Sequence, residues 1–214
     1  LRRFIDIEYR LPEPSTDDFI EFQVQYHKLD QYITEQTPHP MFSRDNTDYS
    51  VLFPLMVKIL FEAIPCSLRD IEKYFNHIEY VIRTLKLNRG DFFVSVFLTY
   101  VYIFKRDIYE QIKECRYNDV ELLHTVEDLL IAGKIELDSN LGQLTIEIMV
   151  EMMNRYRVTI ESQNVKDDER LTDLANFKSK HILSLDSKNV FRYNYLSKSL
   201  DTYINKIEMT EAIR

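Results

Sequence analysis

Glu121 and His124 form an E-x-x-H pair, the spacing in this sequence that comes nearest to metal chemistry. On a helix this spacing puts both side chains on one face, as in the di-iron sites of helical bundles. Such a site also needs a second E-x-x-H motif and two further glutamates, and the sequence has no second E-x-x-H. We therefore interpret the pair as exposed helix surface and predict no metal site.

Histidine and cysteine are too dispersed to form a recognisable catalytic constellation. The sequence contains no His-Asp dipeptide, no H-E-x-x-H and no G-x-S-x-G. Cys66 and Cys115 form neither a C-x-x-C motif nor a disulfide framework. We interpret them as reduced thiols and expect a cytoplasmic protein. Four histidines are interpreted as surface or capped residues rather than as bases or metal ligands: His27, His39, His77 and His181.

Glycine is unusually scarce, with 3 residues among 214. Phosphate-binding loops depend on glycine for tight turns and for close approach of the backbone to a ligand. Gly90, Gly133 and Gly142 each stand alone, so the chain contains neither a P-loop nor a dinucleotide-binding motif. A nucleoside triphosphate cannot be held here by a phosphate-binding loop of this chain's own.

Composition points to a folded, soluble, mainly helical protein. Hydrophobic residues make up 45% and aromatic residues 13%, which is enough to bury a large core. The net charge of −8 and the pI of about 5.2 disfavour nucleic acid and anionic membranes as partners. The longest apolar run, residues 92–104, is too short to span a bilayer and is interpreted as a buried central helix.

Hydrophobic periodicity predicts one strand followed by a multi-helix bundle. Residues 4–11 alternate apolar and polar side chains, which is typical of a strand, and Pro12 and Pro14 end it. A lone strand needs a neighbour, which would lie outside this sequence or in another copy of the chain. The chain begins with this strand at Leu1 and not at a methionine, so we expect a piece of a longer protein. Helices are predicted over about 15–33, 49–63, 67–85, 92–104, 118–132, 143–160, 170–184 and 190–208.

Two helix starts carry capping boxes, at Ser15–Asp18 and Ser67–Asp70. After the first, an apolar stripe runs through Phe19, Phe22, Tyr26, Leu29 and Ile33 and predicts one continuous amphipathic helix. After the second, the stripe is complete, and Gly90 is interpreted as its stop signal. Its members are Ile71, Tyr74, Phe75, Ile78, Val81, Ile82 and Leu85.

Two segments in this order resemble the KAP family of P-loop NTPases. Residues 1–14, LRRFIDIEYRLPEP, are similar to the last strand of the family's nucleotide-binding domain. Residues 67–76, SLRDIEKYFN, are similar to the lid helix that follows it. The resemblance covers residues 1–90. It implies three parts: residues 1–14 as the last strand of an α/β P-loop domain, 15–90 as a helical lid, and 91–214 as a C-terminal helical domain.

The resemblance implies an ATPase in which this chain is the lid and arm. ATP and Mg²⁺ would be bound mainly by residues outside this sequence, because the family's phosphate-binding loop, magnesium-holding Asp and catalytic acid precede the strand. Expected partners are the preceding P-loop domain of the same polypeptide and either further copies of the chain or an effector protein. A role in anti-phage defence is a further expectation from the family, and the fragment alone should be inactive.

Arg69 is the candidate catalytic and nucleotide-binding residue. Its place in the lid helix matches the family's sensor arginine, which implies contact with the γ-phosphate of ATP. The alternative is a surface arginine paired with Asp70 or Glu72. The resemblance also places Arg10 and Pro12 near the adenine, against an alternative as structural edge residues.

A second function from another class stays open. The chain could be a non-enzymatic helical adaptor that binds protein partners through aromatic-rich grooves. A glycine-rich phosphate-binding segment upstream would decide between the two hypotheses.

Overall fold

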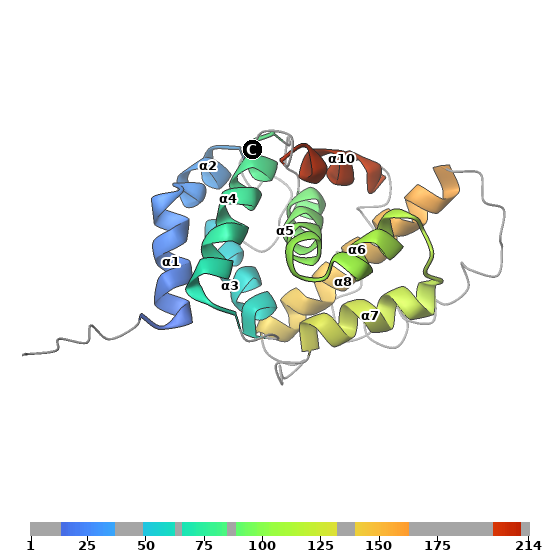
Figure 1. Cartoon of the computed structure of the whole chain (residues 1–214), viewed down its shortest axis with the longest axis horizontal. Helices are drawn as coiled ribbons and strands as arrows, with labels where there is room; N and C mark the ends of the chain where they lie inside the picture. The colour runs from blue at the N-terminus through green and yellow to red at the C-terminus, as the bar shows by residue number, and fades with distance from the viewer. Residues whose placement is uncertain are drawn as a thin grey trace, which may run out of the picture.

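A computed structural model describes residues 14–36, 49–62, 66–84, 89–131, 140–162 and 199–210. These residues form nine helices and contain no strand (Figure 1). The helices are α1 (Thr16–Tyr26), α2 (Leu29–Gln36), α3 (Tyr49–Glu62), α4 (Leu68–Thr84), α5 (Arg89–Phe104), α6 (Arg106–Lys113), α7 (Asp119–Ile131), α8 (Asn140–Ser162) and α10 (Asp201–Met209).

The mainly helical class is confirmed for the described residues. The predicted strand over 4–11 and the predicted helix over 170–184 lie outside them, as does the first part of the helix predicted over 190–208. Helices α3, α4, α5, α7 and α8 agree closely with their predicted ranges. Helix α6 was not predicted, because its eight residues are mostly polar and follow the apolar run directly.

The prediction of one continuous helix over 15–33 is wrong. The chain breaks between α1 and α2 at Lys28, whose φ of 52° lies in the left-handed region. The break rotates the two halves of the stripe relative to each other. Leu29 and Ile33 are buried, whereas Phe22 and Tyr26 are exposed.

Local hydrogen bonds explain why the helices begin where they do. Ser15 accepts the Asp18 N–H at 3.1 Å, which caps α1. Asn118 and Glu121 form a reciprocal box at the start of α7, in which Asn118 Oδ1 accepts the Glu121 N–H at 2.9 Å. A reciprocal box of the same kind, formed by Ser67 and Asp70, begins α4. The interpretation of Gly90 as a stop is wrong, since α5 begins at Arg89 and contains it.

Helix α5 lies near the middle of the molecule, with α4 on one side and α8 and α10 on others (Figure 1). Every side chain from Asp91 to Tyr102 is buried, which confirms the interpretation as a central helix. One hydrophobic cluster runs from Ile20 in α1 to Ile207 in α10 and includes the predicted stripe of α4 through Ile82. Packing of α4 on α5 therefore spans the proposed boundary at 90/91, which itself stays a prediction.

Candidate functional site

Arg69 lies in the first turn of α4, where a capping box orders the backbone. The Asp70 N–H donates to Ser67 Oγ at 3.3 Å, and the Ser67 N–H donates to Asp70 Oδ2 at 3.0 Å. The Arg69 side chain is exposed, and among the described residues it makes neither of the ion pairs considered above, with Asp70 or Glu72. Its guanidinium is therefore free to bind an external anion.

The Asp70 carboxylate, next to Arg69 in the chain, accepts hydrogen bonds from Ser67 at the start of the helix. Hydrogen bonds from the Ser67 hydroxyl and backbone hold the pKa of Asp70 below its ordinary value, and the nearby charges of Lys73 and Arg69 add to this effect. The Ser67 hydroxyl lies 2.7 Å from Asp70 Oδ2. Because Asp70 bonds back to Ser67, it does not fold over the guanidinium.

Arg69 lies at the end of the bundle where α1 begins. Lys58, near the end of α3, lies 3.2 Å from Asp17 in the first turn of α1. Only residues 63–65 separate α3 from the segment that leads into α4, so α4 begins at that same end. Figure 1 shows α1 and α4 starting at the lower edge and rising side by side. Arg10 and Pro12, the other predicted nucleotide-binding residues, lie outside the described residues.

Cys66, just before α4, is not poised for nucleophilic chemistry. Partial burial raises the pKa of its thiol, Asp70 raises it further, and Lys105 acts in the opposite direction. A thiol with a raised pKa is protonated at neutral pH, and the thiolate is the reactive form. Cysteine chemistry at this end of the bundle is therefore disfavoured.

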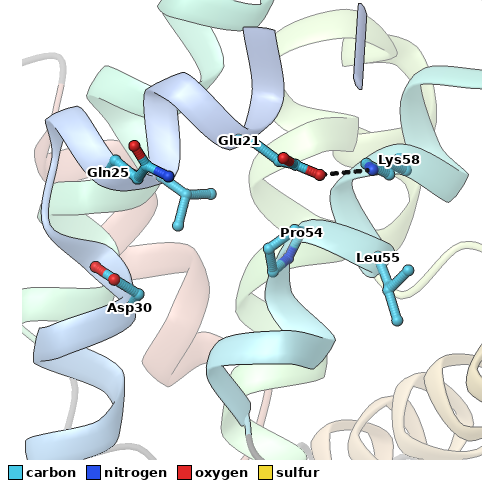
Figure 2. A pocket seen from close by; sticks show the side chains of 7 residues that line it. Glu21, Gln25, Asp30, Pro54, Leu55 and Lys58 are labelled. Carbon is cyan, nitrogen blue, oxygen red and sulfur yellow. Dashed lines mark hydrogen bonds and ion pairs between the residues drawn. The ribbon is translucent and has the colours of Figure 1, made fainter. Parts of the chain in front are cut away.

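A groove of about 330 Å³ lies between α1 and α3 (Figure 2). Lys58 projects along one side of it and makes ion pairs of 3.2 Å with both Asp17 and Glu21. Partial burial opposes the charge of Lys58, but the hydrogen bonds to the two carboxylates outweigh it and raise its pKa. Lys58 therefore remains positively charged, and the carboxylates of Asp17 and Glu21 compensate that charge. The lining residues are Glu21, Val24, Gln25, Asp30, Pro54, Leu55 and Lys58.

His27, expected at the surface, is buried where α1 meets α4. Its Nδ1 lies 2.7 Å from Glu79 Oε2, and Arg83 Nε donates to the other oxygen of Glu79 at 2.9 Å. A carboxylate that orients a histidine is typical of general-base pairs. Here His27 Nε2 is buried and has no hydrogen-bond partner, so it holds no nucleophile. The pair ties α1 to α4. His77 is also buried rather than at the surface, and its Nδ1 lies 2.9 Å from the Lys73 carbonyl oxygen.

A second buried polar cluster joins α5, α8 and α10. Asp91 is 0% exposed and Arg155 is 3% exposed, and their Oδ1 and Nη2 atoms lie 3.1 Å apart. The Tyr203 hydroxyl donates to the same carboxylate oxygen. Burial raises the pKa of Tyr203, and its hydrogen bond to Asp91 adds to the rise. Because these groups are enclosed, we assign the cluster to structure.

Metal chemistry finds no support within the described ranges. They contain no group of three or more His, Cys, Asp or Glu side chains that could hold a metal ion. Glu121 caps α7, and His124 lies at the surface 3.4 Å from Glu127. This agrees with the interpretation of the E-x-x-H pair as helix surface. None of the described helices combines the length and the apolarity needed to cross a membrane.

Comparison with family models, with curated proteins and with solved structures finds no match to this chain. The resemblance to the KAP family therefore stays a prediction.

Proposed function

We propose that this chain is the helical lid and C-terminal arm of a KAP-type ATPase, with Arg69 acting on ATP held by a preceding P-loop domain. The observation that carries the proposal is the exposed guanidinium of Arg69 in the capped first turn of α4, which forms no ion pair with any of the described residues. It lies at the end of the bundle where α1 begins, directly after the segment that resembles the last strand of a nucleotide-binding domain. A nucleotide-binding domain would adjoin this end.

An arginine suits this role better than any other residue at the same end. Its planar fork of donors matches the oxygens of a phosphate, and its charge persists at every physiological pH. ATP with Mg²⁺ would supply the transferable phosphoryl group, and residues outside this sequence would hold both. Arg69 would stabilise the negative charge that builds up on the phosphoryl oxygens.

Helix α4 would transmit the difference between bound ATP and its hydrolysis product from the Arg69 end to the C-terminal helical part, residues 91–214. Its buried stripe packs on α5, and the Tyr74 hydroxyl donates to the Val96 carbonyl at 3.2 Å. A movement of the Arg69 end would therefore displace α5, which contacts α6, α8 and α10. This continuous packing supports coupling of ATP turnover to oligomerisation or to sensing of an effector.

The test is steady-state ATP turnover by the longer protein that includes the P-loop domain. Loss of an arginine that contacts the transferring phosphoryl group costs on the order of 10³-fold in rate. We expect Arg69→Ala to show such a loss with an unchanged thermal melt. Arg69→Lys should rescue poorly because an ammonium lacks the planar fork. Arg116→Ala, at an exposed site outside any helix, is the matched control and should leave turnover unchanged.

Unchanged turnover in both Arg69 variants would refute the proposed role and favour the non-enzymatic helical adaptor instead. The 214-residue chain alone provides a second check, because it lacks a phosphate-binding loop. We expect calorimetry to detect no ATP binding by it, and micromolar affinity would contradict the assignment of ATP to the preceding domain.

A further inference from the structure

Helix α1 presents three stacked aromatic side chains, Phe19, Phe22 and Tyr26, which we call the aromatic ladder. The ring centroids of Phe19 and Phe22 are 6.0 Å apart, and those of Phe22 and Tyr26 are 5.9 Å apart. Phe22 is 54% exposed and Tyr26 is 70% exposed. Large apolar side chains that cluster on a surface at this exposure mark an interaction site more often than isolated ones do.

Elsewhere in the described part of the chain, several tyrosine rings have an arginine of the protein itself lying over them. The Arg83 guanidinium lies 5.0 Å from the ring centroid of Tyr32, and that of Arg106 lies 4.3 Å from the ring centroid of Tyr102. Such contacts stabilise a cation over the negative face of the ring. No cation of the described residues lies over Phe22 or Tyr26. An arginine could reach these rings from another molecule.

The charge around the aromatic ladder is acidic. Helix α1 holds three acidic side chains, Asp17, Asp18 and Glu21, and no lysine or arginine. Lys58 in α3 compensates two of them, Asp17 and Glu21. Asp18 is exposed and lies one helical turn before Phe22, so it shares the face of the aromatic ladder. Its carboxylate accepts from the Ser15 hydroxyl at 2.6 Å and retains further acceptor sites.

The acidic charge of α1 favours a different protein over a second copy of this chain as the partner that binds the aromatic ladder. Two copies meeting through α1 would bring two acidic surfaces together, and like charges disfavour such a contact. A basic segment would be attracted to the same surface. Its apolar side chains would pack on Phe22 and Tyr26 while an arginine contacts Asp18.

We propose that the aromatic ladder and Asp18 form a docking surface for an arginine-bearing, amphipathic segment of a partner protein. The arginine would stack on the exposed rings and donate to the Asp18 carboxylate. This surface does not depend on ATP chemistry, so its test is independent of the role of Arg69.

The experiment measures binding of a labelled amphipathic helical peptide of leucine, alanine and arginine to the 214-residue chain by fluorescence anisotropy. A second peptide carries neutral citrulline in place of each arginine. We expect Phe22→Ala and Tyr26→Ala each to weaken binding of the arginine peptide by about two- to fivefold, as for exposed cation–π contacts. Asp18→Asn should weaken it by a similar factor.

Two controls separate this site from general attraction to an acidic protein. Met209→Ala removes another exposed apolar side chain, and Asp128→Asn removes another exposed acid, and neither should change the affinity. Thermal melts of the Phe22, Tyr26, Met209 and Asp128 variants should match that of wild type, since these side chains are exposed. Asp18→Asn loses the contact with the Ser15 hydroxyl, so its binding is measured well below its own melting temperature. Equal binding of the citrulline peptide, or equal affinity of the ladder variants, would overturn the proposal. So would self-association of the chain that Phe22→Ala abolishes.

Discussion

Adjacent side chains at the start of α4 lie in different surroundings. Asp70 bonds back to Ser67 and fastens the helix end, whereas Arg69 extends into solvent. Substitution of the first residue should therefore change stability, and substitution of the second should change function. This difference lets the two effects be measured separately.

The Asp70 carboxylate should make stability depend on acid pH. Its folded-state pKa lies below the ordinary value of 3.8, because Ser67 donates to the charged form. Its contribution to the free energy of unfolding is therefore complete above the unfolded-state pKa and is lost as the pH falls through the folded-state pKa. We expect Asp70→Asn to be less stable than wild type at pH 7, with the difference shrinking towards pH 3. Urea unfolding across this range measures it.

The control for this prediction is Asp107→Asn, in the first turn of α6, where no side chain caps the helix. It should reduce stability less than Asp70→Asn at pH 7. A constant difference between wild type and Asp70→Asn at every pH would contradict the assigned role of the carboxylate.

At the scale of helices, the features that could be predicted from the sequence are those set by residues close to one another in the chain. The stripe of α4 and the predicted helix starts at Ser15 and Ser67 involve residues three or four apart. The structure confirms the stripe through Ile82, the cap at Ser15 and the reciprocal box at Ser67. The break at Lys28 was not predictable in this way. Apolar residues continue at helical spacing through it, and no glycine marks the left-handed residue. Phe22 and Tyr26 were consequently placed in the core.

Lys28 gives a test of the break between α1 and α2. A non-glycine residue with positive φ costs roughly 1 kcal/mol or more, and glycine adopts this conformation without that penalty. We expect Lys28→Gly to raise the free energy of unfolding by about 0.5 kcal/mol after the entropy of glycine in the unfolded chain is included. Chemical denaturation measures the change.

The matched control is Lys73→Gly, at an exposed position inside α4. In a helix interior the same substitution should be destabilising by about 1 kcal/mol. If both variants were destabilised to the same extent, Lys28 would not be the strained end of α1 that its φ of 52° indicates.

At the scale of the whole molecule, the cluster of Asp91, Arg155 and Tyr203 joins helices that are far apart in sequence. Tyr203 and Asp91 are 112 positions apart, and nothing in the local pattern of either residue predicts the contact. The same holds for His27 and Glu79, which are 52 positions apart. The start of the helix that holds Arg69 could be predicted from the sequence because its capping box is local, whereas these buried pairs exist only once the helices pack.

Tyr203→Phe should weaken the attachment of α10. The substitution keeps the ring but removes the donor to the buried Asp91 carboxylate. Losing a hydrogen bond to a charged group costs about 1.5–3 kcal/mol. We expect a decrease of this size in the free energy of unfolding, measured with urea. Tyr32→Phe is the control, because its hydroxyl donates to the Arg83 carbonyl at an exposed site and should contribute less.

The order of these helices along the chain has a consequence during protein synthesis. Helix α5 ends at Phe104, and α10 does not begin until Asp201. At about 5–20 residues per second, a ribosome needs roughly 5–20 s to make the residues between them. Asp91 lacks Tyr203 throughout that interval and lacks Arg155 for about its first half, and an ionised carboxylate resists transfer out of water. The Asp91 end of the nascent α5 would therefore stay in contact with water. Its remaining apolar side chains would be exposed during the same interval, and chaperones bind exposed apolar segments of this kind.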